Sequence, residues 1–87
     1  MTDAEIQDAL TGIYRRIFNA PAFVPRDGMS GRDVPNADSL SAIAFLLELQ
    51  KVFRIAISAL EAGQLETVAD VRGLVARKLT EQGRRHA

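Results

Sequence analysis

Residues 38–53, DSLSAIAFLLELQKVF, decide how the rest of this chain can be arranged. The segment opens with two good N-cap residue types, so we expect a helix that begins at Asp38 or Ser39 and ends at about Phe53. At about 100° per residue, its apolar side chains divide into two opposed stripes. The first stripe comprises Leu40, Ile43, Ala44 and Leu47, and the second comprises Phe45, Leu46, Leu49, Val52 and Phe53.

The two stripes leave two alternatives for this helix. Either it is buried on all sides, or it buries one stripe and leaves the other free for a partner or a bound hydrophobic group. A chain of 87 residues offers little protein to surround a central helix. We therefore expect the second stripe to enter the core and the first to face outward.

Two further amphipathic segments lie on either side of this helix. Thr2 and Glu5 form a capping box that opens a first helix, which should end near Asn19, just ahead of a proline. Thr67 opens a last helix, with Asp70 as its capping partner. The apolar side chains of these helices recur at helical spacing and are expected to complete the core. They are Ile6, Leu10, Ile13, Val68, Val71 and Val75, with Tyr14 and Phe18 at its edge.

The connecting segments are rich in turn formers. Residues 21–37 contain three prolines and two glycines and predict a long loop, pinned by the apolar anchors Phe23, Val24 and Val34. Residues 53–57 indicate an extended connector, and residues 59–64 a short helix. Together these segments predict an all-α fold: a small four-helix bundle with three main helices and one short one. We expect a single domain over residues 1–87, ending in a basic, flexible tail at about residues 80–87.

The composition argues against an enzyme. The chain has no cysteine, which removes disulfides, thiolate metal sites and a protein thiol nucleophile. Its one histidine, His86, lies next to the end of the sequence, where neither a general base nor a metal ligand is expected. No set of catalytic groups or metal ligands can be assembled from the rest, so we expect neither catalysis nor a metal site.

Charge and hydropathy limit the partners. Arg77, Lys78, Arg84 and Arg85 are interpreted as ordinary solvated charge, the first two near a helix C-terminus. No basic cluster is interleaved with aromatic residues, so nucleic-acid binding is not expected. The longest apolar run, residues 43–47, is too short to span a membrane, and the acidic N-terminal residues are unlike a signal peptide. These features predict a cytoplasmic protein, which we expect to be a monomer.

The triplet Asp38-Ser39-Leu40, between a long loop and an amphipathic helix, resembles the modification motif of acyl carrier proteins. The residues that follow keep the spacing of that family without a gap as far as Val75. They are Leu49, Phe53, Ile55, Ile57, Leu65, Thr67 and Val68. The motif alone is short, whereas the complete spacing covers about half of the chain.

The resemblance implies a covalent cofactor, phosphopantetheine, which a phosphopantetheinyl transferase moves from coenzyme A onto the Ser39 hydroxyl. The arm would hold acyl or aminoacyl groups as thioesters and deliver them to a loading ligase, a synthase or an acyltransferase. Asp38 would support the transfer, either by orienting the metal and substrate of the transferase or by fixing the start of the helix. The partner-facing residues would be Leu40, Ile43, Ala44, Leu47, Glu48 and Lys51.

The second helix departs from the family in its charge. Ala44, Gln50 and Lys51 stand where acidic residues are common in fatty-acid carriers, and Glu48 is the only acid of this helix after Asp38. This difference favours a specialised carrier over a housekeeping fatty-acid carrier, because charge mainly sets partner choice and association rate. The alternative is a helical interaction module without any arm, which would use Leu40, Ile43 and Leu47 to bind a partner.

Overall fold

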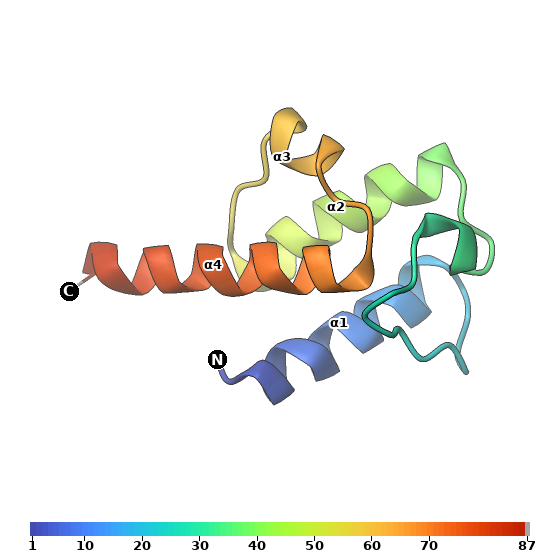
Figure 1. Cartoon of the computed structure of the whole chain (residues 1–87), viewed down its shortest axis with the longest axis horizontal. Coiled ribbons are helices and arrows are strands. Elements are labelled where there is room, and N and C mark those ends of the chain that lie inside the picture. Colours follow the sequence, from blue (N-terminus) through green and yellow to red (C-terminus); the bar gives the residue numbers. More distant parts are fainter. Residues whose placement is uncertain (87) are drawn as a thin grey trace.

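The computed structural model describes the backbone of residues 1–86 and the side chains of residues 1–83, and this part of the chain is an all-α bundle (Figure 1). Its α-helices are α1 (Asp3–Ile17), α2 (Ser39–Phe53), α3 (Ala59–Gly63) and α4 (Val68–His86), and a short 3-10 helix, η1 (Gly31–Asp33), lies in the long connector. The predicted fold of three main helices and one short helix is therefore confirmed.

The helix starts follow the predicted caps. Thr2 Oγ1 accepts a hydrogen bond from the Glu5 amide at 3.1 Å, and Glu5 Oε1 accepts one from the Thr2 amide at 2.8 Å. At the start of α4, Asp70 Oδ2 accepts from the Thr67 amide at 3.1 Å, and Thr67 Oγ1 accepts from the Asp70 amide at 3.2 Å. The chain leaves α1 through Asn19, whose φ of 50° is a left-handed conformation that asparagine tolerates.

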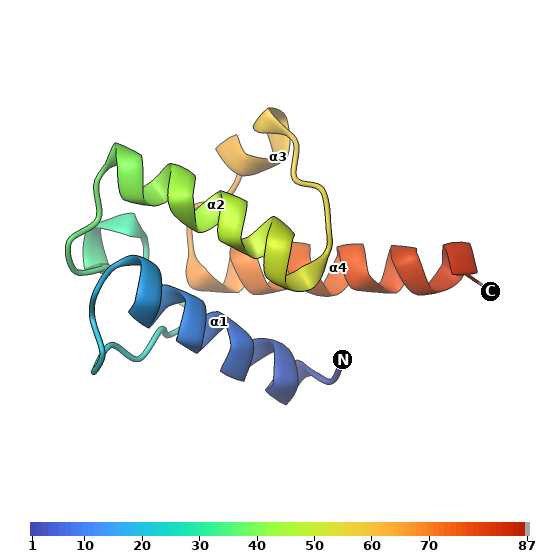
Figure 2. The same cartoon turned by 180° about the vertical axis from the view of Figure 1, so that it is seen from behind.

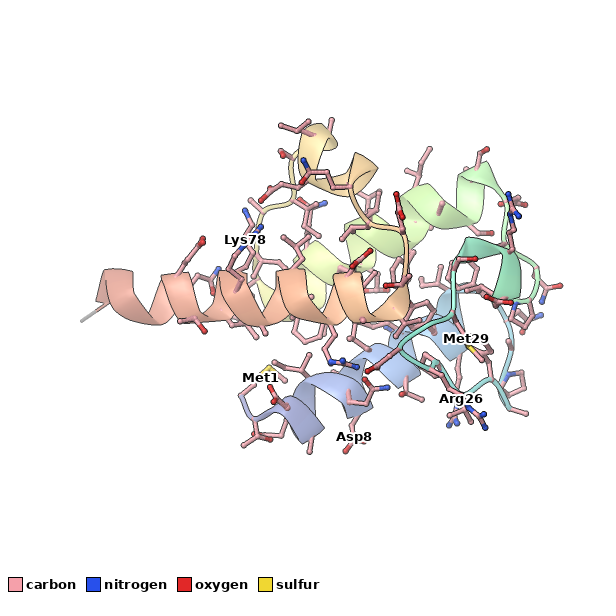
Figure 3. All side chains as sticks on the ribbon, viewed as in Figure 1. Met1, Asp8, Arg26, Met29 and Lys78 are labelled. Carbon is pink, nitrogen blue, oxygen red and sulfur yellow. The ribbon has the colours of Figure 1, made fainter. Side chains whose placement is uncertain are left out.

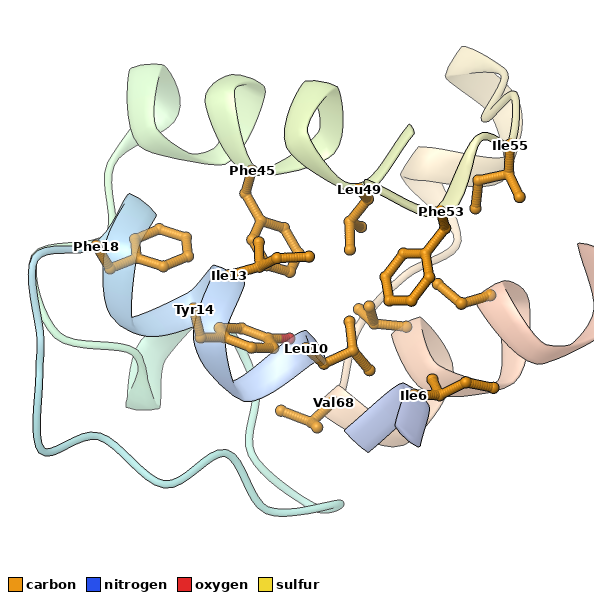
Figure 4. Close-up of a cluster of buried hydrophobic side chains, with 12 residues drawn as sticks. Ile6, Leu10, Ile13, Tyr14, Phe18, Phe45, Leu49, Phe53, Ile55 and Val68 are labelled. Atoms are coloured by element: carbon orange, nitrogen blue, oxygen red, sulfur yellow. The ribbon is translucent and has the colours of Figure 1, made fainter. Parts of the chain in front are cut away.

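The core forms where α1 packs against both α2 and α4 (Figure 4). All of the core residues expected from α1 and α4 are buried, as are Phe45, Leu49 and Phe53 of α2. Leu46, which was also expected in the core, is only partly buried and packs against it. Two expectations were wrong. Val52 is exposed, because it lies about 60° around the helix from Leu49 and at the edge of the buried arc. Val24 is also exposed, because the connector is held at Phe23, whose carbonyl accepts from Arg15 Nε at 2.7 Å.

The long connector runs from the end of α1 to the start of α2 and is tied to the bundle along its way (Figure 2). The Arg72 guanidinium on α4 binds both carboxylate oxygens of Asp27, at 2.5 Å and 3.0 Å. The Val68 amide donates to the Met29 carbonyl at 2.9 Å, and Asn36 Nδ2 donates to the Phe18 carbonyl at 2.8 Å. These ties set where α2 begins, and so they position its first residues.

The short helix α3 is held to α4 by charge. Glu61 accepts from Lys78 Nζ at 2.8 Å and lies 3.4 Å from a guanidinium nitrogen of Arg77; Lys78 rises from α4 toward α3 in Figure 3. The expected position of Arg77 and Lys78 near a helix C-terminus was wrong, because α4 continues to His86 and places both in mid-helix. Arg77 is exposed, as expected of solvated charge, whereas Lys78 is mostly covered.

The predicted basic tail overlaps the end of α4, which includes residues 80–86. The side chains of Arg84, Arg85 and His86 lie outside the described residues, so the interpretation of these residues as solvated charge and of His86 as inert stays a prediction.

Candidate functional site

At the start of α2, the side chain of Asp38 caps the helix and that of Ser39 does not. Asp38 is the N-cap, with extended backbone angles of φ −143° and ψ 179°, and its Oδ1 accepts from the Ser41 amide at 2.7 Å. Hydrogen bonds from the backbone and side chain of Ser41, and then from the Leu40 amide, lower the pKa of Asp38 from its usual value. The Asp38 carboxylate is therefore held in place by hydrogen bonds and caps the N-terminus of α2.

Ser39 is the first residue of α2 and is exposed. Its hydroxyl has no hydrogen-bond partner among the described residues, because Asp38 takes the capping role. The other serines at helix starts are occupied: Ser30 Oγ accepts from the Arg32 amide, and Ser58 Oγ accepts from the Glu61 amide. The unpaired N–H groups at a helix N-terminus favour an anion, so a phosphate ester on Ser39 would be stabilised there.

An apolar pocket of about 200 Å³ opens beside this helix start. Ala37 and Ala42, which flank Ser39 in the sequence, belong to its wall. Large apolar lining side chains come from α1, α2, α4 and the segment between α3 and α4: Tyr14, Phe45, Leu46, Leu65, Val68 and Val71. The sequence analysis missed this pocket. The only trace of the pocket in the sequence is the alternation of small alanines with large apolar side chains around Ser39. This pattern does not distinguish a pocket from a filled core.

The outward stripe of α2 is open to solvent. Leu40, Ile43 and Leu47 are 77%, 56% and 62% exposed, so the helix is not buried on all sides. Ala44, between them, is partly buried. The exposed stripe begins next to Ser39 and continues along two turns of the helix, which is the placement expected of a partner-facing surface.

The exposed charged side chains at the C-terminal end of this stripe are positive. Glu48, predicted to face a partner, is largely covered, and its carboxylate lies 3.4 Å from the Arg16 guanidinium of α1. Lys51 is exposed. Arg54, the αL C-cap of α2 at φ 55°, is exposed as well. The sequence analysis missed the Arg16 pair, because nothing in the order of residues brings α1 beside Glu48.

The described residues contain no cluster of three or more side chains suited to a metal ion. Nor does any helix in this part of the chain have the length and apolar character needed to cross a membrane.

The chain matches no protein-family model and no curated protein, but solved structures share its fold. The holo acyl carrier protein of Geobacter metallireducens, determined by NMR, superposes with a TM-score of 0.85 and 31% sequence identity, over 93% of each chain. A proposed acyl carrier protein of Mycobacterium tuberculosis superposes with a TM-score of 0.74 and 30% identity, over 82% of this chain and 95% of that one.

Proposed function

Because this chain belongs to the acyl carrier protein family, we propose that it carries an acyl group as a thioester on a phosphopantetheine arm attached to Ser39. The observation that carries the proposal is the free, exposed hydroxyl of Ser39 beside a capping Asp38. When bound, the arm supplies the thiol that a chain without cysteine lacks.

The local geometry suits the attachment reaction. The Ser39 oxygen forms a bond to the phosphorus of the arm, its proton passes to the transferase, and the adenosine bisphosphate part of coenzyme A leaves. The product places a phosphodiester at the N-terminus of α2, where the helix dipole and free N–H groups stabilise negative charge. Asp38 keeps this end of the helix in place through its bond to the Ser41 amide.

The mass of the intact protein tests the proposal. After incubation with coenzyme A and a broad phosphopantetheinyl transferase, we expect the wild-type chain to gain the mass of one arm and Ser39→Ala to gain none. Ser41→Ala is the matched control, since it removes a hydroxyl two residues further along the same helix, and it should load like the wild type. Arm attachment in Ser39→Ala would refute the assignment, and a wild type that no transferase loads would favour an interaction module without an arm.

The pocket supports the carriage of an acyl group. A volume of about 200 Å³ is more than ten times the roughly 15 Å³ that a single water needs, so the pocket has room for a short chain. The lining is mainly apolar, and Ala37 and Ala42 bring part of it close to Ser39, so a chain on the arm has a nearby apolar surface on which to be buried. The pocket therefore suits a short acyl group, or the end of a longer one.

The face of α2 supports a specialised set of partners. The exposed stripe Leu40, Ile43 and Leu47 is the apolar contact, and its charged surroundings are Lys51 and Arg54, with Glu48 already paired to Arg16. Partner enzymes that recognise an acidic helix would find little to bind here. We propose that the transferase and loading enzyme of this carrier dock through apolar contact at this face, with little electrostatic steering.

A further inference from the structure

The pocket lining includes a buried polar side chain, Tyr14, whose hydroxyl has no hydrogen-bond partner among the described residues. Tyr14 of α1 is 4% exposed and lines the pocket. Its ring packs against Phe45 at a centroid distance of 4.5 Å and against Phe18 at 6.1 Å. Figure 4 shows its phenolic oxygen within an otherwise apolar cluster of side chains. A phenylalanine would fill the same packing position without the hydroxyl.

The Tyr14 hydroxyl has no hydrogen-bond partner among the described residues. Within the same residues, no fully enclosed side-chain oxygen or nitrogen lacks a partner. Both statements hold only if the hydroxyl borders open space, and the pocket that Tyr14 lines is such a space. In the empty pocket water can reach this hydroxyl, and a plain hydrocarbon chain that fills the pocket displaces that water without replacing its hydrogen bond.

The other polar side chains of the pocket lining, Ser30, Thr67 and Glu66, are more exposed to solvent than Tyr14. Ser30 Oγ accepts from the Arg32 amide at 3.3 Å, and Thr67 Oγ1 accepts from the Asp70 amide at 3.2 Å. Glu66 is exposed. Among the described residues that line the pocket, Tyr14 therefore has the most deeply buried polar side chain.

We propose that Tyr14 makes the pocket selective for acyl groups that carry an oxygen along their chain, a hydroxyl or a keto group, to which its own hydroxyl donates a hydrogen bond. The inference rests on the proposed carriage of an acyl group on Ser39. A plain hydrocarbon chain leaves the hydroxyl unpaired, whereas an oxygenated chain satisfies it, and such a difference discriminates between ligands more strongly than a methylene does.

The protonation state of Tyr14 fits the role of donor. Burial raises the pKa of Tyr14 to about 12, because the apolar surroundings disfavour the phenolate. The hydroxyl therefore keeps its proton over the whole range in which the protein would work. Because a pocket of about 200 Å³ has room for a short chain, six-carbon chains serve as the probes.

The test uses the carrier loaded on Ser39 with hexanoyl, 3-hydroxyhexanoyl or 5-hydroxyhexanoyl arms, because the depth of the oxygen along the chain is not given by the structure. Intact mass first establishes that each arm is attached, and the melting temperature is then compared with that of the unacylated holo form. For wild type, we expect one of the hydroxylated chains to raise Tm by about 4–8 °C more than hexanoyl does, the shift that one hydrogen bond produces in a domain of this size.

Tyr14→Phe should keep the Tm rise caused by hexanoyl and lose the extra rise. Ser30→Ala is the matched control, because it removes a hydroxyl from the rim of the same pocket, and it should keep the extra rise. A second readout needs no variant: Tyr14 is the only tyrosine and the chain has no tryptophan, so near-ultraviolet absorption reports this hydroxyl alone. We expect the tyrosine band to shift with the hydroxylated chain and not with hexanoyl.

Three results would overturn the inference: equal stabilisation by all three chains in the wild type, an extra rise that survives in Tyr14→Phe, or an equal loss for hexanoyl in that variant, which would mean that the bond goes to the thioester carbonyl of the arm. If the arms attach and these results appear, only the selectivity of the pocket is wrong. If no arm attaches to Ser39, the proposed function itself is wrong.

Discussion

At the first residues of α2, one side chain caps the helix and its neighbour is the proposed attachment point. Asp38 accepts the Ser41 amide and caps the helix, which leaves the Ser39 hydroxyl exposed and unbonded. If serine were the cap, its oxygen would point back to an amide and be a poorer acceptor of the arm. The aspartate therefore makes the adjacent serine available.

Removing the cap should affect both stability and modification. We expect Asp38→Ala to lower the free energy of unfolding by the amount typical of a lost N-cap, and to slow arm transfer to Ser39, because the helix start frays. Asp38→Asn should keep the stability, since asparagine caps as well as aspartate. The measurements are urea unfolding and the rate of arm transfer to Ser39, each for both variants.

The asparagine variant separates the two roles of Asp38. Normal transfer to Asp38→Asn means that the residue acts by fixing the helix, whereas slow transfer to this stable variant means that its charge assists the transferase. A stability of Asp38→Ala equal to that of the wild type would contradict the capping role.

On the scale of elements, α2 is a helix with two apolar faces and only one core to bury them. Leu49 is fully buried against α1 and α4, while Leu47, two residues earlier, is 62% exposed. The same side-chain type therefore stands in opposite environments on one helix, which makes the pair a matched comparison of packing and docking.

The two leucines should respond differently to truncation. Leu49→Ala should lower the free energy of unfolding by about 2–5 kcal/mol, because it leaves a cavity in the core. Leu47→Ala should cost less than about 1 kcal/mol and instead slow transfer and loading, because apolar anchors dominate the energy of an interface. Denaturant unfolding and loading rates, each at low and high ionic strength, provide the measurement.

The two ionic strengths test the kind of contact. Rates on the wild type should change little with salt, because Glu48 is paired and few charges remain to steer a partner. A strong salt dependence would contradict an apolar docking face, and so would a Leu47→Ala variant that unfolds as readily as Leu49→Ala.

On the scale of the whole molecule, one carboxylate holds the short helix to the bundle. Glu61 completes the cap of α3 by accepting the Ser58 amide at 3.0 Å, and it also binds Lys78 and Arg77 of α4. The hydrogen bond from Lys78, together with the bonds to Ser58, lowers the pKa of Glu61 from 4.5 to about 2. Residues of α3 and of the segment that follows, Ala62 and Leu65, form part of the pocket wall, so this carboxylate also supports the pocket.

The stability that Glu61 contributes should depend on pH. Because its pKa is lower in the folded state, the contribution is complete above about pH 4.5 and is lost as pH falls toward 2. Glu61→Gln should therefore melt below the wild type at pH 7, and the difference in Tm should shrink on acidification. Asp8→Asn is the control, because Asp8 is exposed on α1, away from α3 (Figure 3); its Tm should follow the wild type. A constant gap between pH 7 and 2.5 would contradict the role of Glu61.

The sequence by itself determined the helices, their caps and the position of Ser39. These features are local: a capping side chain satisfies an amide three residues away, as Thr2 does for Glu5 and Asp38 does for Ser41, and apolar spacing is read within a few turns. The all-α fold and the exposed stripe of α2 followed from the same short-range rules, together with the small size of the chain.

The tertiary structure alone decided which residues meet across the bundle. Asp27 and Arg72 are 45 positions apart, Glu61 and Lys78 are 17 apart, and no periodicity relates them. The exposure of Val52 and the pocket beside Ser39 depend on where α1, α3 and α4 stop covering α2. Such distances are set by the packing of side chains between helices, which the order of residues along one helix does not contain.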